Sequence, residues 1–257
     1  MDFKQCHAVI TGGGSGLGLA LAQHVITVGG KVVILDLNRE RCAEELVLLG
    51  EQAHFIATDV TSEIAVDGAL LQAQEFLQGE IRLVVNCAGI APSQRVLGRE
   101  RPMSSIEFQQ AINVNLNGTF NVCRAAVNLM QHNATIGKDE ERGVLVNTAS
   151  IAAFEGQIGQ AAYAASKGGV VSMTLPLARE FARLGIRVMT IAPGLFETPM
   201  FEVLPPEARE TLAADTPYPR RLGHPDEFAA LVQHIVENPM LNGSTIRLDG
   251  ALRMGPK

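Results

Sequence analysis

The sequence predicts an α/β fold, a doubly wound parallel sheet of seven strands with helices on both faces. Short apolar runs alternate with longer helix-forming stretches along the whole chain. Most of these runs are continuously apolar, which is typical of strands buried on both faces of a parallel sheet. No linker, repeat or low-complexity segment marks a second domain. The predicted strands are residues 6–11, 31–36, 53–58, 82–88, 143–150, 186–193 and 244–250.

The segments between these strands are predicted to form the helices that cover the sheet. Stretches such as LALAQHVITVG, after the first strand, and AALVQHIVE, before the last, consist largely of residues that are tolerated or favoured in helices. An unbroken alternation of strands and helices is typical of one doubly wound sheet. We therefore predict that residues 1–257 form a single catalytic domain.

Two connections are longer than the others. Residues 91–106 follow the fourth strand and residues 194–224 follow the sixth. In open α/β sheets, ligands bind beyond the carboxyl ends of the strands, so both connections should border a ligand site. Residues 199–214 look helical, and we expect segment 194–224 to close over a substrate as a lid.

Composition and charge limit the classes of partner. The formal net charge of -6 argues against a dedicated nucleic-acid-binding protein, which usually carries a basic face. Local basic clusters are either solvated surface or contacts for an anionic ligand. These clusters are Arg95, Arg99 and Arg101, and Arg220 with Arg221.

Cysteine usage and apolar run length indicate the compartment. The cysteines are not arranged in a C-x-x-C pair, so we expect them to be reduced and to form no metal site. They are Cys6, Cys42, Cys87 and Cys123. No run approaches the roughly 20 apolar residues of a membrane-spanning helix. We expect a cytoplasmic protein that does not enter a membrane, unless a leader has been removed.

Residues 11–18, TGGGSGLG, predict a phosphate-binding turn. Gly12, Gly16 and Gly18 lie between a strand and a helix, where backbone N–H groups can approach a pyrophosphate at the helix N-terminus. The general G-x-G-x-x-G pattern does not fit, because Leu17 occupies its third position, but the longer T-G-x-x-x-G-x-G pattern does. A glycine-rich turn alone is weak evidence, and the flanking strand and helix make it strong.

An acid at the end of the second strand predicts the cofactor. Asp36 lies 18 residues after Gly18, where its carboxylate can accept hydrogen bonds from the ribose and repel a 2′-phosphate. Leu37 follows, so no arginine directly after the acid can pair with that phosphate. This favours NAD over NADP, although Asp36 could instead cap the next turn. Asp59, with Val60, can reach the adenine edge or cap the helix that begins near Ser62.

Residues 163–167, YAASK, predict an acid–base site. Tyr163 and Lys167 are four residues apart and share one face of a helix. A nearby ammonium and a positive nicotinamide would lower the pKa of the phenol from its usual value near 10. Ser150 ends the fifth strand and can bond a substrate oxygen, and Asn115, within a predicted helix, can hold a water through its amide. Each residue alone also fits a cap or a solvated surface position.

These motifs resemble the short-chain dehydrogenase/reductase superfamily, whose sheet is of the Rossmann type. The resemblance rests on TGGGSGLG, NCAG (86–89), NVNLNG (113–118), APGLFETP (192–199) and the spacing of Ser150, Tyr163 and Lys167. It runs from about residue 6 to the C-terminus. Three further stretches are similar to the branch of type II 3-hydroxyacyl-CoA dehydrogenases, which includes 17β-hydroxysteroid dehydrogenases. They are NTASIAAFEGQIGQAAYAASKGG, GIRVMTIAPGLFETP and NGSTIRLDGALRM.

The resemblance implies roles for individual residues. It implies a catalytic tetrad of Asn115, Ser150, Tyr163 and Lys167. The implied NAD contacts are Gly12, Ser15, Gly16, Leu17, Gly18, Asp36, Asp59, Val60, Cys87, Ala88, Gly89, Tyr163, Lys167, Pro193, Phe196 and Thr198. The implied substrate contacts are Ser150 and Tyr163, and we expect Phe154 and Gln160, which lie near the tetrad in sequence, to line an acyl pocket. It also implies a homotetramer, and Glu197 departs from the small residue typical of this branch.

The implied reaction is NAD-dependent oxidation of L-3-hydroxyacyl-CoA to 3-ketoacyl-CoA, as in fatty-acid β-oxidation, with a small-molecule substrate and no direct nucleic-acid binding. Two other dehydrogenase functions share every motif, a 3-ketoacyl reductase and a hydroxysteroid or other alcohol dehydrogenase. A function of another class is a scaffold subunit in an RNA-processing complex.

Overall fold

The computed structural model describes residues 1–199, 207 and 212–256. Within them, seven parallel strands form one sheet in the order β3-β2-β1-β4-β5-β6-β7, which confirms the predicted fold. The strands are β1 His7–Thr11, β2 Lys31–Asp36, β3 Ala53–Ala57, β4 Leu83–Asn86, β5 Gly143–Thr148, β6 Ile186–Pro193 and β7 Thr245–Leu248. The order reverses between β1 and β4, and ligands bind at such a switch point in open α/β sheets.

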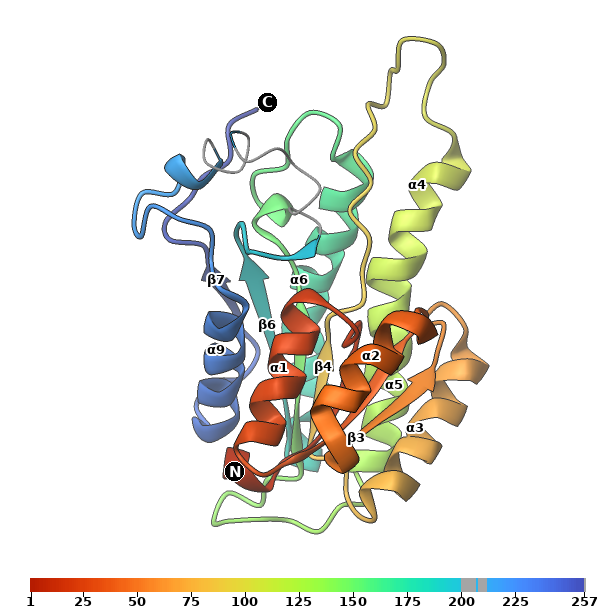
Figure 1. Ribbon diagram of the computed structural model, residues 1–257, viewed down its shortest axis with the longest axis vertical. Coiled ribbons are helices and arrows are strands. Elements are labelled where there is room, and N and C mark those ends of the chain that lie inside the picture. Colours follow the sequence, from red (N-terminus) through yellow and green to blue (C-terminus); the bar gives the residue numbers. More distant parts are fainter. Residues whose placement is uncertain (200–206, 208–211, 257) are drawn as a thin grey trace.

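Helices cover both faces of the sheet (Figure 1). On one face lie α1 Gly16–Thr27, α2 Arg39–Leu49 and α9 Pro225–Glu237. On the other lie α3 Glu63–Leu77, α5 Gly118–Met130 and α6 Ala161–Phe181. Successive strand side chains point to opposite faces, so in β1 Ile10 packs with the first group and Val9 with the second. Burial on both sides explains why the strands are continuously apolar.

The strands are shorter than predicted at several ends. Arg82, predicted to start the fourth strand, precedes β4 and donates from its guanidinium to the carbonyl of Ala134 at 2.7 Å. Cys87 and Ala88, predicted to end it, form the turn beyond β4. Ser150 likewise lies beyond β5, where it begins a short 3-10 helix, η4 Ile151–Ala153.

A buried arginine ties the end of α9 to the sheet. Arg187, in β6, donates to the carbonyls of Ile235 and Val236 at 2.7 and 2.8 Å and pairs with the carboxylate of Glu141 at 2.6 Å. Both charged side chains are 8% exposed, and Glu141 also accepts from the N-terminal ammonium of Met1 at 3.1 Å, so this buried carboxylate has two cationic partners.

The two long connections lie at the carboxyl edge of the sheet. Residues 91–104 rise above β4 and turn into α4 Ser105–Ile112, at the top of Figure 1. The start of 194–224 returns to its end, because Phe196 pairs with Gly223 in a parallel bridge. Most of the predicted helical lid, 199–214, lies outside the described residues. Among the described helices, none is both long and apolar enough to span a bilayer.

Candidate active site

The glycine-rich turn joins β1 to α1 and fits tightly against the end of β4. Gly12 has φ +65°, and a Cβ there would lie 2.7 Å from the backbone nitrogen of Ala88. Gly16 has φ +54°, which also disfavours a side chain. Ser15 precedes α1 without a side-chain hydrogen bond to the helix. The first N–H groups of α1 are therefore available to an anion.

Asp36 lies beside this turn. Its Oδ2 accepts from the backbone N–H of Gly14 at 3.1 Å, and its Oδ1 accepts from that of Asn38 at 3.0 Å. The predicted turn-capping contact is therefore present. A carboxylate oxygen can accept more than one hydrogen bond, so the same group can still accept from a ribose hydroxyl.

Asp59 caps a turn and not the helix itself. Its Oδ1 accepts from the backbone N–H and hydroxyl of Thr61, and Ser62 caps α3 by accepting from Ala65 at 3.3 Å. Val60 is buried and packs against Gly118, where a Cβ would lie 2.6 Å from its side chain. Asp59 itself is exposed at the carboxyl edge of β3.

The NCAG turn after β4 reaches two residues of the predicted tetrad, Asn115 and Lys167. The N–H of Ala88 donates to the hydroxyl of Thr11 at 3.1 Å, which links this turn to β1. A Cβ on Gly89 would lie 3.1 Å from Asn115 Oδ1 and 3.4 Å from Lys167 Nζ. The missing side chain therefore lets the turn approach both groups closely. Cys87 lies beside them, with its Sγ 3.6 Å from the hydroxyl of Thr148.

Lys167 is buried beneath Tyr163 on α6. Its side chain is 5% exposed, and its Nζ donates to the carbonyl of Thr148 at 2.7 Å. Burial lowers the pKa of this ammonium to about 8. A buried ammonium can donate three hydrogen bonds, so Lys167 has capacity for further acceptors such as ribose hydroxyls.

The pKa of Tyr163 corrects one expectation. Burial raises it above the ordinary value near 10, and a hydrogen bond with Ser150 opposes this shift. The expected lowering by Lys167 is not found in the protein alone, where desolvation of the phenolate is the largest effect on this pKa and the opposing contribution comes from Ser150. Ser150 also accepts from the N–H of Ala152 at 3.1 Å, so the predicted cap and the contact with Tyr163 are both present.

Asn115 lies in a π-helical turn, Asn113–Asn117, between α4 and α5. Its amide donates to the carbonyl of Ile90 at 2.8 Å and to the hydroxyl of Ser166 at 2.9 Å, and its Oδ1 accepts from the N–H of Ile90 at 2.8 Å. Both amide hydrogens are thus committed to protein partners, so a water held by this amide would have to donate to Oδ1, and that contact stays a prediction.

Ser166 is a site residue that sequence reasoning missed. It is fully buried, accepts from Asn115 and donates to the carbonyl of Tyr163 at 2.7 Å. It thereby connects the NCAG side of the site to the catalytic helix. The one sequence feature that could have indicated this role is the position of Ser166 directly before Lys167. A serine within a helix, however, usually donates only to a backbone carbonyl in the preceding turn of the same helix.

The loop after β6 crosses the glycine turn. A Cβ on Gly16 would lie 3.2 Å from the side chain of Thr198, and Phe196 is buried against Gly223. Pro193 ends β6 at the same edge. Glu197 is exposed and lies 3.1 Å from Nδ1 of His224, so the two ends of segment 194–224 are in contact.

The two predicted acyl-pocket residues have other contacts. The ring of Phe154 is 48% exposed, with the guanidinium of Arg247 at 5.2 Å from its centroid. Gln160 precedes α6 and accepts from the N–H of Gln157 at 3.0 Å. Both lie at the carboxyl edge, and their contact with an acyl chain stays a prediction.

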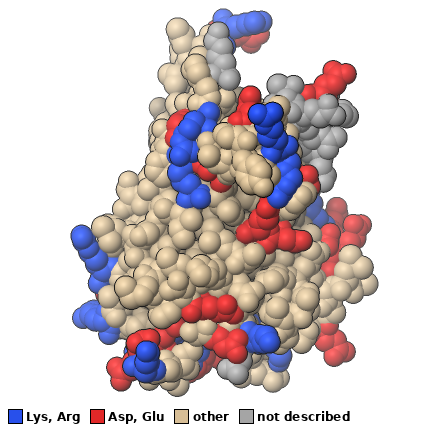
Figure 2. All heavy atoms as spheres, turned by 90° about the vertical axis from the view of Figure 1, so that its left-hand side faces the viewer, with Lys and Arg blue, Asp and Glu red and all other residues tan. Residues whose placement is uncertain are grey.

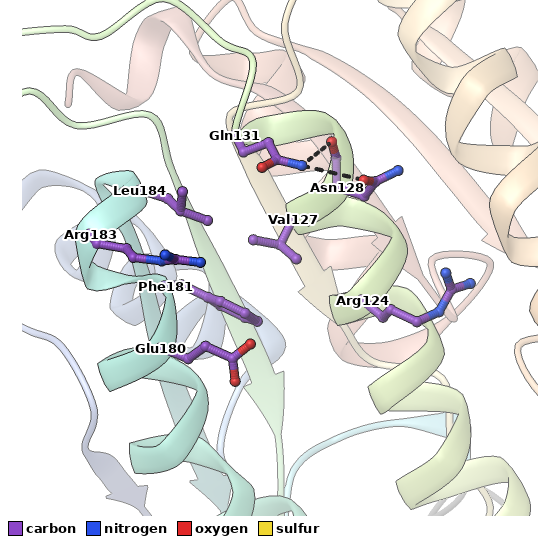
Figure 3. Close-up of a pocket in the computed structure, with 8 residues that line it drawn as sticks. All are labelled: Arg124, Val127, Asn128, Gln131, Glu180, Phe181, Arg183 and Leu184. Carbon is purple, nitrogen blue, oxygen red and sulfur yellow. Dashed lines mark hydrogen bonds between the residues drawn. The ribbon is translucent and has the colours of Figure 1, made fainter.

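A separate cavity of about 250 Å³ lies between α5 and α6 (Figure 3). Its lining includes Val127, Phe181 and Leu184. Residues 182–184 lead into the start of β6, so this cavity is at the amino edge of the sheet, opposite Tyr163. It contains none of the predicted site residues.

The site as a whole fits a nicotinamide dinucleotide. The open N-terminus of α1 suits the pyrophosphate and Asp36 suits the adenosine ribose, while the turn at Gly89, close to Lys167, suits the nicotinamide end. A phenol, a hydroxyl and a buried ammonium at that end can move a proton to or from an oxygen. Fold and site therefore define a dinucleotide-dependent oxidoreductase.

The chain belongs to the short chain dehydrogenase family, whose sequence profile matches residues 6–209. It is 51% identical over 251 residues to the 3-hydroxyacyl-CoA dehydrogenase type-2 of Bos taurus, covering 97% of this chain and 95% of that protein. It is 49% identical to the protein of the same name from Drosophila melanogaster, covering 98% and 99%.

Solved structures agree with this assignment. A crystal structure of 3-hydroxyacyl-CoA dehydrogenase type-2 from Mycobacterium avium superposes with a TM-score of 0.93 at 42% identity, covering 99% of this chain and 98% of that one. A 3-ketoacyl-(acyl-carrier-protein) reductase from Brucella melitensis, complexed with NADH, gives 0.86 at 28% identity, covering 98% and 100%. The protein is thus an oxidoreductase enzyme.

Proposed function

We propose that this enzyme oxidises L-3-hydroxyacyl-CoA to 3-ketoacyl-CoA with NAD. The main support is the identity of about half of all residues, over nearly the whole chain, with proteins named 3-hydroxyacyl-CoA dehydrogenase type-2. The juxtaposition of Ser150, Tyr163 and Lys167 supplies the groups that this chemistry needs.

The preference for NAD rests on Asp36. Its carboxylate lies beside the glycine turn, where a 2′-phosphate of NADP would meet a negative charge. Leu37, the next residue, is 70% exposed and offers no compensating cation. We therefore expect the enzyme to prefer NAD to NADP.

In the proposed reaction the bound NAD supplies the hydride acceptor. Ser150 donates a hydrogen bond to the substrate oxygen, and the oxygen of Tyr163 takes the hydroxyl proton. In the protein alone the phenol is neutral at pH 7, the form that returns a proton to a ketone in the reverse direction. For oxidation, the positive charges of Lys167 and of the nicotinamide favour the phenolate.

The remaining residues position these groups. We assign Asn115 and Ser166 to holding the backbone around Tyr163, because their hydrogen bonds end on Ile90 and on the Tyr163 carbonyl. We assign segment 194–224 to the wall and cover of the substrate site, within one catalytic domain of residues 1–257. A homotetramer remains a prediction from the family resemblance, and a cytoplasmic location remains a prediction from cysteine usage and apolar run length.

A substrate panel tests the substrate class. The panel holds acetoacetyl-CoA, acetoacetyl-acyl carrier protein and a steroid ketone, each reduced with NADH or NADPH. The proposal expects the largest kcat/KM with acetoacetyl-CoA and NADH. A preference for the carrier-protein thioester would favour a reductase like that of Brucella melitensis, and a preference for the steroid would favour a hydroxysteroid dehydrogenase. NADH binding without turnover of any ketone would favour a scaffold role.

Tyr163→Phe tests the acid–base assignment. Loss of the phenolic proton should lower kcat by roughly 10²- to 10⁴-fold and leave NADH binding largely intact. The chain contains one other tyrosine, Tyr218, which is 83% exposed, so Tyr218→Phe is the matched control. Turnover by Tyr163→Phe at the rate of this control would refute the assignment.

A further inference from the structure

The chain between Ser150 and Tyr163 joins two side chains that the proposed reaction places on the same substrate oxygen. After η4 it consists of turns and irregular backbone until α6 begins at Ala161. Residues 154–160, named here the linking segment, therefore depend on other parts of the chain to fix their position. The structure supplies contacts to this segment from β7 and from the residues that follow β7.

Arg247, in β7, holds the linking segment through Glu155. Its Nη1 and Nη2 donate to Oε1 and Oε2 of Glu155 at 2.6 and 2.8 Å. The two side chains are 22% and 26% exposed, so water reaches the pair only in part. The hydrogen bonds from Arg247 lower the pKa of Glu155 below its ordinary value, which keeps the pair charged at neutral pH. A two-pronged pair fixes the orientation of the carboxylate as well as its distance.

Arg247 is itself fixed by the residues that follow β7. Its Nε donates to Asp249 Oδ2 at 2.7 Å, and its Nη2 donates to the carbonyl of Leu252 at 3.1 Å. The Asp249 side chain is 7% exposed and also accepts from Arg253 at 3.1 Å. Figure 2 shows basic and acidic side chains next to one another in the upper part of the face that carries β7. A two-pronged pair within such a network contributes more than an isolated surface pair.

The C-terminal segment, residues 249–256, adds backbone contacts to this anchoring. The N–H of Ile158, in the linking segment, donates to the carbonyl of Pro256 at 3.0 Å. The N–H of Tyr218, near the end of the connection after β6, donates to the carbonyl of Gly250 at 3.3 Å. The C-terminal segment therefore contacts both the linking segment and the connection that is expected to cover the substrate.

We propose that Arg247 is a positioning residue of the acid–base site, which acts through Glu155 on the chain that joins Ser150 to Tyr163. This role rests on the proposed function, because it requires both side chains to meet one substrate oxygen. Displacement of reacting groups by about 1 Å can lower a rate roughly 100-fold. Release of the linking segment from β7 therefore lowers kcat without removing any group that touches the substrate or the dinucleotide.

Arg247→Gln and Glu155→Gln test this role from the two ends of the contact. In Arg247→Gln both acids keep a cation, because Arg253 lies 3.5 Å from Glu155 and 3.1 Å from Asp249, so the fold should be retained. We expect a roughly 10- to 100-fold lower kcat with acetoacetyl-CoA and NADH, with KM and NADH binding close to wild type. Glu155→Gln should show the same pattern, and the double variant should fall little further, since both substitutions break one contact.

Hydrogen exchange measures how firmly the linking segment is held, without any need for activity. Amides of residues 154–160 should exchange faster in both variants than in wild type, while those of α9 and β1 should not change, because the opening is local. The matched control is Arg124→Gln, which breaks an ion pair with Asp67, at 2.6 Å, between α5 and α3. The control should leave kcat and the exchange of the linking segment unchanged.

The outcomes separate the positioning role from the proposed function. Wild-type kcat in the folded variants, with or without a loss of stability, would overturn the role, and so would equal exchange of the linking segment in all three proteins. If Arg247→Gln does not fold, Glu155→Gln decides alone. If wild type does not reduce acetoacetyl-CoA, the proposed substrate fails, and kcat is measured with the ketone of the panel that is reduced. If no ketone is reduced, the proposed function fails, and the exchange comparison still decides whether Arg247 holds the segment.

Discussion

Replacing Lys167 by methionine should stabilise the fold near neutral pH and remove activity. The ammonium is buried at 5% exposure with one hydrogen bond to the carbonyl of Thr148, and burial lowers its pKa to about 8. A methionine side chain has a similar length and carries no charge to desolvate. The substitution removes the free-energy cost of burying the ammonium, which the folded protein retains because the group is needed for function.

The size of this cost follows from the pKa. The difference between 10.5 and about 8, at about 1.4 kcal/mol per pKa unit, corresponds to roughly 3 kcal/mol. Below pH 8 the folded and unfolded states both hold the proton, so the full cost is present. Between pH 8 and 10.5 the unfolded state binds more protons, so stability rises with pH, and above 10.5 the cost is gone.

Urea unfolding of wild type and Lys167→Met at a series of pH values measures this cost. Other groups also titrate at alkaline pH, including the thiol of Cys87, whose pKa desolvation raises to about 11, so the difference between the two proteins is the quantity to compare. The charge of Lys167 lowers the pKa of this thiol, so the substitution also shifts the titration of Cys87. The variant should be more stable by roughly 3 kcal/mol at pH 7, and its advantage should vanish by pH 10.5. Lys138→Met, at an exposed lysine, is the control. A stability difference that is constant with pH would refute the reasoning.

Three further substitutions test the surroundings of the site. Ser166→Ala should lower kcat more than it changes KM and reduce the free energy of unfolding by ~1–3 kcal/mol, because Asn115 loses a buried partner, while Ser166→Thr should retain most activity in the same assays. Arg187→Ala should reduce stability by about 1–3 kcal/mol in urea, because the buried carbonyls of Ile235 and Val236 lose their donor, with kcat of the folded enzyme unchanged. Asp36→Asn should shift the ratio of kcat/KM for NADP over NAD upward by roughly tenfold, since a repulsive charge is removed, and an unchanged ratio would contradict the role given to Asp36.

Much of the fold was predictable because parallel strands leave a strong pattern. Residues 31–36 and 186–193 were predicted to the residue, since burial on both faces makes most of their side chains apolar. Strand ends were less predictable where a polar side chain bonds to a partner outside the sheet. The sequence predicts that Arg82 starts a strand, but its guanidinium donates a hydrogen bond to the carbonyl of Ala134 outside the sheet.

Parts of the site were predictable where the backbone conformation allows only one residue type. Gly12 must be a glycine because of its positive φ and its approach to Ala88, so the motif marks the turn. Ser166 carries no such mark, because a buried hydroxyl between two elements has the same sequence appearance as one on a helix surface. The raised pKa of Tyr163 also depends on three-dimensional burial, which the four-residue spacing to Lys167 does not encode.

The pKa shifts of the buried Tyr163 and Lys167 suggest how the acid–base chemistry depends on a bound dinucleotide. Burial raises the pKa of Tyr163 and lowers that of Lys167, so in both cases desolvation opposes the charged form. The protein alone thus disfavours the phenolate–ammonium pair that oxidation requires. A positively charged nicotinamide beside the phenol, and ribose hydroxyls that accept from the ammonium, would each shift this balance toward the charged pair. Under the proposed function, bound oxidised dinucleotide would therefore favour the form of Tyr163 that accepts a proton, and would couple proton removal from the alcohol to the presence of the hydride acceptor.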